Sequence, residues 1–154
     1  MRAAEAFEGK NESTQRTRTT VLRFPEGLIG FGECRNFVLI EEEDISPFRR
    51  LQSTDRVDVG FFVLDPEYVR RNFLSLVSES DWESVGLADP DAKRVLVICR
   101  LGSTLAQSTG NLQAPLIVND ATRTGRQVIL GNEYISCRQP LFQSVRRNNG
   151  YPSV

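Results

Sequence analysis

The chain has 154 residues, of which 40% are hydrophobic and 25% charged, a composition that fits one globular domain with a single core. Its formal net charge of −1 lacks the basic surplus typical of a nucleic-acid-binding domain, so no direct nucleic-acid partner is expected. It has no histidine, which excludes Ser-His-Asp and Cys-His catalytic sites and the commonest imidazole metal ligand.

Cysteine spacing and the first residues bear on metal binding and on localisation. Cys34, Cys99 and Cys137 are widely separated, so they predict no zinc site and no disulfide framework, and each is expected to be buried as a small hydrophobic side chain. Residues 1–20 lack the apolar stretch of a secretory signal, and no apolar run is long enough to span a bilayer. We therefore expect a cytoplasmic protein with no cofactor and no membrane partner.

Three segments of different character divide the chain. Residues 1–17 are polar and charged without a sustained period, which predicts a flexible N-terminal segment. Residues 18–141 carry the strand and turn patterns of the folded domain, and residues 142–154 form a polar C-terminal tail. Within the domain, the β-prone residues 19–24 end at the turn 25–27, where proline fixes φ and glycine accepts positive φ.

A glycine-punctuated apolar segment, 28–32 (LIGFG), follows this turn. Two glycines make a regular element there unfavourable. Phe24, Leu28, Ile29 and Phe31 therefore either pack over one end of the fold or present an exposed apolar patch to a partner. The sequence leaves both alternatives open.

An acidic run, residues 41–44 (EEED), directly follows the short buried strand predicted for residues 37–40. Four like charges in succession repel one another, so we expect them to face water. Glu41, Glu42 and Glu43 are then either a solvated turn or a contact that attracts a basic partner.

The middle of the chain predicts a hairpin and a helix. Residues 48–53 and 57–64 read as two antiparallel strands joined at a turn around residues 53–55. The sequence Ser80-Asp81-Trp82-Glu83 has the form of a capping box, and Gly86 supplies a stop. One short helix of about two turns is expected between them.

The last third of the domain predicts further strands. Residues 95–99 (VLVIC) have the continuous apolar pattern of a strand covered on both faces. Residues 111–119 form a strand that must lie at an edge or carry a bulge, because Pro115 cannot donate to a sheet. A turn at 124–126 leads into residues 127–130, and 134–140 is the last ordered stretch. This pattern of short strands with one helix predicts a mainly β fold, a small sandwich or barrel.

Several motifs have a functional and a structural interpretation. Asp55, Asp58 and Asp65 could converge on a cation, but turn and strand-end roles explain each of them, and we favour these. Arginine pairs such as Arg49-Arg50 could contribute to a single-stranded RNA-binding barrel, although adjacent strand residues point to opposite faces. A hydrolase that uses two carboxylates is a third hypothesis, which needs two acids in one cleft.

Four motifs, in this order, resemble the flagellar assembly factor FliW family: FPEGLIGF at 24–31, LQS at 51–53, FFVLDP at 61–66 and NLQAPLIVN at 111–119. The resemblance extends from about Thr19 to Pro140. It implies a small, largely antiparallel β-barrel with one short helix, without catalytic activity or cofactor, which we expect to be a monomer when free.

The resemblance also implies two protein partners that bind in turn. Flagellin would occupy the protein while it accumulates unsecreted. After flagellin is exported, the freed protein would bind the RNA-binding translational regulator CsrA, at a surface distinct from its RNA site, and relieve repression of flagellin translation. The candidate partner-binding residues are Phe24, Leu28, Ile29, Phe31, Glu41, Glu42, Glu43, Asn111 and Pro115.

Overall fold

The computed structural model describes residues 16–141. Its first hairpin shows how the alternation of buried and exposed side chains along a strand shapes the fold. Strands β1 (Thr17–Arg23) and β2 (Asn36–Glu42) pair in antiparallel register over their full length. Leu22, Phe37 and Leu39 are buried, whereas their neighbours within the two strands, such as Val21 and Val38, are more exposed. Because side chains alternate across a strand, one face of this hairpin lines a core and the other faces outward.

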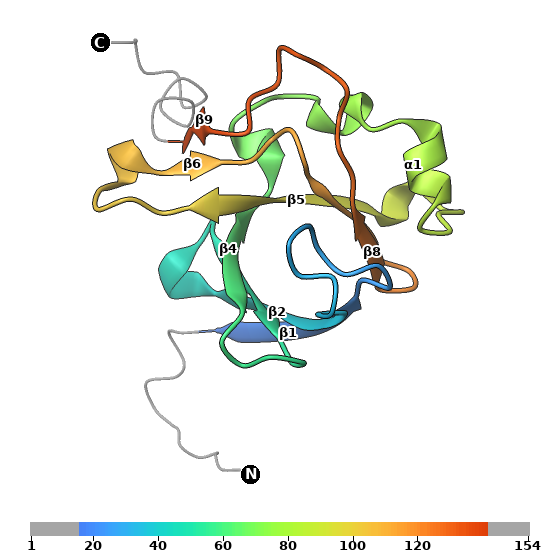
Figure 1. Cartoon of the computed structure of the whole chain (residues 1–154), viewed down its shortest axis with the longest axis horizontal. Coiled ribbons are helices and arrows are strands. Elements are labelled where there is room, and N and C mark those ends of the chain that lie inside the picture. The colour runs from blue at the N-terminus through green and yellow to red at the C-terminus, as the bar shows by residue number, and fades with distance from the viewer. Residues whose placement is uncertain (1–15, 142–154) are drawn as a thin grey trace.

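Five further strands complete a closed ring with β1 and β2. They are β3 (Arg49–Ser53), β4 (Gly60–Leu64), β5 (Lys93–Arg100), β7 (Leu116–Asn119) and β8 (Thr124–Gln127). Their order is β4-β3-β2-β1-β8-β7-β5, and pairing of β4 with β5 closes the barrel (Figure 1). Among the described strands only the contact of β1 with β8, through Arg23 and Thr124, is parallel. The predicted mainly β, largely antiparallel barrel is confirmed.

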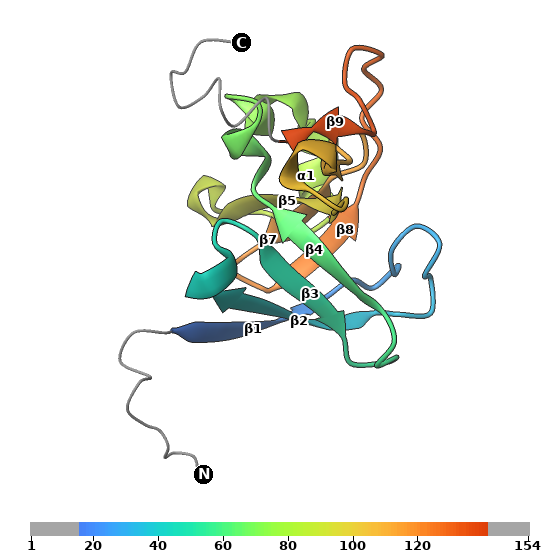
Figure 2. The ribbon, with the colours of Figure 1, turned by 90° about the vertical axis from the view of Figure 1, so that its left-hand side faces the viewer.

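Two short strands, β6 (Thr109–Gly110) and β9 (Gln139–Pro140), extend the sheet beyond the barrel from the end of β5. In the side view, β1 to β4 rise in order as one wall, and β9 lies at the far end of the molecule from β1 (Figure 2). The arm made by β5, β6 and the loop between them therefore projects from the barrel.

The helical segments within residues 16–141 are all short. They are α1 (Glu79–Glu83) and the 3-10 helices η3 (Glu43–Ile45), η4 (Pro66–Tyr68), η5 (Phe73–Leu76), η6 (Pro90–Ala92) and η7 (Leu105–Gln107). The single short α-helix is confirmed, but the predicted cap is wrong. Ser78, not Ser80, caps α1, because the amide of Asp81 donates to Ser78 Oγ at 3.1 Å. Gly86, at φ +72°, follows the helix as expected.

Apolar side chains form two cores, one on each side of the barrel wall. The inner core fills the barrel with residues such as Leu22, Leu39, Leu96 and Leu116. The outer core packs the other face of β5 and β7 against the segment that contains η4, η5 and α1, and includes the buried Trp82. Alternate residues of β5 enter different cores, which explains its continuous apolar sequence.

Three local predictions fail, and for Pro115 the structure shows the reason. Pro115 lies just before β7, which is an interior strand, so the proline removes no donor from the ladder and no edge is needed. Residues 124–126, predicted as a turn, begin β8, and the turn lies at residues 120–123. Cys34 and Cys99 are buried as expected, whereas Cys137 is exposed.

Candidate functional site

The predicted site residues lie in separate regions instead of forming one cluster. The segment from Phe24 to Phe31 is bonded to the start of β2, where the amide of Phe24 donates to the carbonyl of Arg35 at 2.7 Å. Glu41 and Glu42 are the last residues of the same strand. A seven-residue strand rises about 20 Å, so these two groups lie at opposite ends of the barrel.

The apolar segment packs over one end of the barrel, which decides between the two alternatives. Phe24 and Leu28 are buried, and Phe24 meets the ring of Phe37 edge-on with centroids 5.6 Å apart. Phe31 is partly buried against Phe61 in a similar contact at 5.4 Å. Ile29 alone of the four candidates is largely exposed, at 58%. Three of the four therefore stabilise the fold, and one is available to a partner.

Gln127 holds this segment in place, a role that the sequence did not indicate. The amide of Ile29 donates to Gln127 Oε1 at 2.8 Å. Gln127 Nε2 in turn donates to the carbonyl of Ala114 at 3.0 Å. The side chain thus joins two loops to β8. No local pattern predicts such a contact, because its partners lie 98 and 13 residues away.

The acidic run at the other end faces water only in part: Glu43 and Asp44 are exposed as predicted, whereas Glu41 and Glu42 are partly buried. Register places Arg49 beside Glu41, and Glu41 Oε1 lies 3.4 Å from Arg49 Nε. Glu41 Oε2 lies 3.8 Å from Arg94 Nη1, and Arg94 Nε donates to Asp120 Oδ2 at 3.0 Å. Glu41, Arg49 and Arg94 side chains are only 22%, 28% and 26% exposed. The prediction failed for Glu41 and Glu42 because arginines on β3 and β5 supply the opposite charge.

The next two glutamates are also paired. Arg50 Nε donates to Glu42 Oε1 at 3.3 Å, on the opposite face of β3 from Arg49. Glu43, the most exposed of the three, lies 3.9 Å from Arg16 Nε. The run therefore presents no row of uncompensated carboxylates to a basic partner.

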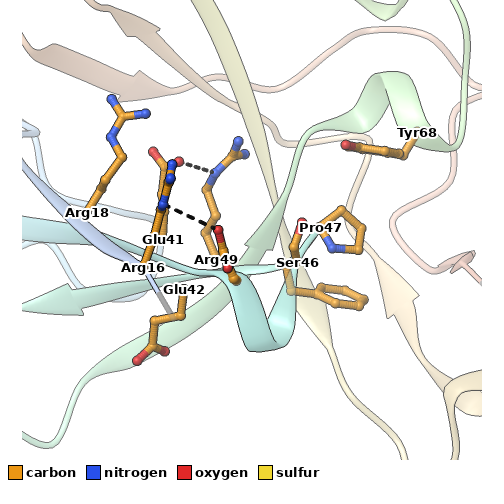
Figure 3. A pocket seen from close by; sticks show the side chains of 10 residues that line it. Arg16, Arg18, Glu41, Glu42, Ser46, Pro47, Arg49 and Tyr68 are labelled. Carbon is orange, nitrogen blue, oxygen red and sulfur yellow. Dashed lines mark ion pairs between the residues drawn. The ribbon is translucent and has the colours of Figure 1, made fainter. Parts of the chain in front are cut away.

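A hollow of about 240 Å³ opens beside these ion pairs, between β1, β2 and η3 and the side chain of Tyr68. In Figure 3 Glu41 and Arg49 face each other at its centre, and Tyr68 lies across the hollow near Pro47. Arg18 also lines the hollow. Its register partner Glu41 is bonded to other arginines, and no ion pair joins Arg18 to another residue in the range 16–141.

Asn111 and Pro115 make structural contacts. Asn111 Oδ1 accepts from the amides of Gln113 and Ala114, at 3.1 and 3.2 Å, and so closes a turn. Pro115 is buried, and its carbonyl accepts from the amide of Val128 at 3.0 Å. Both residues shape the connection into β7.

The three candidate cation ligands have the structural roles that we favoured. Asp55 accepts from the amides of Arg35 and Asn36, and these hydrogen bonds lower the pKa of its carboxyl group. Asp58 pairs with Arg56 at 2.8 Å, and Asp65 caps η4. Across residues 16–141 no three potential ligands come together.

Two rival hypotheses find little support in the same geometry. Within residues 16–141 the carboxyl groups whose pKa departs from its ordinary value, Glu33, Asp55 and Asp58, are all shifted downward, opposite to what a general acid needs. Arg49 and Arg50 point to opposite faces and are bound to glutamates, so they form no stripe for RNA. No helix within the described residues is long and apolar enough to cross a membrane.

Comparisons of the sequence and of the structure with known proteins all point to the same protein family. The model of the FliW protein family matches residues 7–141, which reaches further toward the N-terminus than the motifs did. Flagellar assembly factor FliW of Leptospira interrogans is 37% identical over 137 residues, 88% of this chain and 89% of the relative. That of Bdellovibrio bacteriovorus is 33% identical over 82% of this chain and 73% of the relative. A crystal structure of the flagellar assembly factor FliW superposes with a TM-score of 0.72 at 30% identity, over 79% of this chain and 85% of that chain.

Proposed function

The chain belongs to the FliW family of flagellar assembly factors, and from that membership we propose that it binds flagellin and, when free of flagellin, the translational regulator CsrA. Bound CsrA would be withheld from flagellin messenger RNA. The protein would therefore act by protein binding in the cytoplasm, without catalysis.

The observation that carries this proposal is the extent of the family match. The match spans every strand of the barrel, both cores, and the segment 24–31 that packs over one end. Of the chain's own features, the paired arginines favour it over RNA binding, because Arg49, Arg50 and Arg94 are each bound to a carboxylate.

Regulation follows from mass action between two partners that exclude each other. While flagellin is abundant, it occupies the protein, and CsrA remains free to repress. When export removes flagellin, the vacated protein binds CsrA. No conformational switch is required of this chain, because competition alone links the flagellin concentration to the free CsrA concentration.

Binding measurements with purified proteins test the proposal. Calorimetric titration of this chain with flagellin, and separately with CsrA, should each show a saturable one-to-one complex. Retention on a single-stranded RNA column with steep salt dependence, in the absence of CsrA, would support the RNA-binding hypothesis instead. If neither protein binds and RNA does, the proposal is wrong.

A further inference from the structure

One edge of strand β1 is open over most of its length. The strand is bonded to β2 from Thr17 to Arg23, whereas β8 pairs with it only through Arg23 and Thr124. In Figures 1 and 2 the N-terminal half of β1 extends away from β8. On this side, no strand within the described part of the chain pairs with residues 17–22.

The hydrogen-bond pattern shows which backbone groups the open edge presents. The amide of Arg23 donates to the carbonyl of Arg123 at 3.0 Å, on the side of β8. Because successive residues of an antiparallel strand bond alternately to opposite sides, the odd-numbered residues of β1 face this edge. The amides and carbonyls of Thr17, Thr19 and Val21 therefore point toward any further strand that lies beside β1.

This edge lacks the features that prevent edge strands from pairing with other chains. Natural edges are short, or carry proline, a bulge or charged side chains. Strand β9, at the other end of the sheet, has two residues and ends in Pro140. Strand β1 has seven residues in unbroken register, without proline. The residues that face its open edge, Thr17, Thr19 and Val21, are uncharged and of types that favour strands. Such an edge is a site for strand addition.

A second copy of the same edge fits it in antiparallel register. With Thr19 opposite Thr19 of the second copy, Thr17 lies opposite Val21, and these pairs can exchange hydrogen bonds across the edge. Arg18 then lies opposite Thr20, so no like charges are directly opposed. The side chains of Thr17, Thr19 and Val21 meet on the outer face, because Leu22, next along the strand, points into the core.

The neighbouring registers are less favourable. Centring the pair on Arg18 places two arginines opposite each other, which destabilises a cross-strand pair. Centring it on Thr20 pairs Thr17 with Arg23, whose amide is already bonded to the carbonyl of Arg123. The register centred on Thr19 avoids both conflicts.

We propose that the free protein forms a two-fold symmetric dimer by antiparallel pairing of β1 with β1 of a second copy, centred on Thr19. A two-fold axis requires a surface that is complementary to itself, which this register provides. Val21, an apolar side chain 62% exposed in the single chain, gains Thr17 of the second copy as a neighbour. The dimer replaces the monomer expected from the family resemblance, and it does not depend on the function proposed above.

Sedimentation velocity of the full chain at rising concentration tests whether the dimer forms. The contact is small, so the dimer is weak, with a dissociation constant below about 1 mM. Amide hydrogen exchange at low and high concentration tests where it forms. The amides of Thr17, Thr19 and Val21 should gain protection as concentration rises, whereas those of Arg18 and Thr20, which are bonded to β2, should not change.

Two results of these measurements would overturn the proposal. One is a chain that stays monomeric up to about 1 mM. The other is full protection of the Thr17, Thr19 and Val21 amides at the lowest concentration, which would show that another part of the same chain covers the edge.

Thr19→Pro removes the amide that pairs across the two-fold axis and takes no donor from the ladder between β1 and β2. Two hydrogen bonds are lost in the dimer, so its dissociation constant should rise by about tenfold or more. The matched control, Thr19→Val, keeps the amide and a β-branched side chain and should dimerise like the parent. A dimer that is as strong in Thr19→Pro as in the parent would place the interface elsewhere and refute the proposal.

A pair of charge variants tests the register without changing the backbone. Thr19→Glu and Thr19→Lys each place like charges opposite one another, so each alone should dimerise severalfold more weakly than the parent. An equal mixture of the two should form a heterodimer at least as strong as the parent dimer. Val57→Glu, at a residue 90% exposed between β3 and β4, is the control and should dimerise normally. A mixture that dimerises no better than either variant alone would overturn the Thr19-centred pairing. None of these readouts involves flagellin or CsrA, so their failure would leave the proposed function standing.

Discussion

Replacing Glu41 by glutamine should destabilise the barrel, because this side chain joins two arginines in a poorly solvated place. Its carboxylate lies 3.4 Å from Arg49 and 3.8 Å from Arg94, and all three side chains are less than 30% exposed. Glutamine keeps the size of the side chain and removes its charge. The guanidinium groups of Arg49 and Arg94 would then lie near each other without the charge of Glu41. Among the described residues, Asp120 would still pair with Arg94.

The expected loss of stability in Glu41→Gln lies between two limits. Breaking a fully buried pair costs about 3–5 kcal/mol, and exposed pairs contribute about 0–1 kcal/mol. With about a quarter of each side chain exposed, we expect the free energy of unfolding to fall by about 1–3 kcal/mol. For a domain of this size that lowers the thermal midpoint by about 3–9 °C.

Thermal and denaturant unfolding of Glu41→Gln measure this effect, with Glu43→Gln as the control. Glu43 is 55% exposed and 3.9 Å from an arginine that is 81% exposed, so its change should cost less than about 0.5 kcal/mol. Equal midpoints for the parent and both variants would refute the reasoning. The acidic run would then behave as the solvated turn, one of the two alternatives that the sequence left open.

Three further predictions concern packing, pH and thiol reactivity. Gly125→Ala would place a Cβ 2.5 Å from the ring of Phe24 in the barrel interior, so denaturant unfolding should show a loss of about 1–3 kcal/mol in stability. Gly131→Ala, whose Cβ would have no neighbour within 4 Å, should leave the stability unchanged. The lowered pKa of Asp55 stabilises the fold above the unfolded-state value near 3.8, so the stability difference between the parent and Asp55→Asn should shrink as pH falls below about 4; a constant difference would contradict this. At pH 8 a thiol reagent should modify the exposed Cys137 rapidly and the buried Cys99, whose pKa burial raises to about 12, only after unfolding; equal rates would show that Cys99 is accessible.

Strands whose patterns are set by local alternation were predictable from the sequence. The hairpin of β3 and β4 and the doubly covered strand β5 appear near their expected positions. The apolar segment after Phe24 was correctly expected to be irregular, since its glycines and turn residues act locally. How it packs involves distant contacts, among them the hydrogen bond from Ile29 to Gln127, and these have no local signal.

The sequence-based predictions were wrong in two situations. In one, two local patterns predicted the same feature equally well; in the other, a strand distant in the sequence supplied the ion-pair partner. Ser78 and Ser80 are each followed three residues later by an acid, so capping chemistry alone does not choose between them. In the structure Ser78 is the cap, and Trp82, four residues on, lies in the outer core. Glu41 and Glu42 were misjudged for the second reason. Like-charge repulsion was assessed along the chain, whereas the neutralising arginines come from β3 and β5.

Competition between the two proposed partners tests the central claim most directly. A preformed complex of this chain with CsrA is titrated with flagellin, and free CsrA is measured by its binding to a labelled flagellin leader RNA. The account predicts that flagellin releases CsrA stoichiometrically and restores RNA binding. A stable ternary complex, or CsrA that keeps binding RNA while attached to this chain, would contradict it.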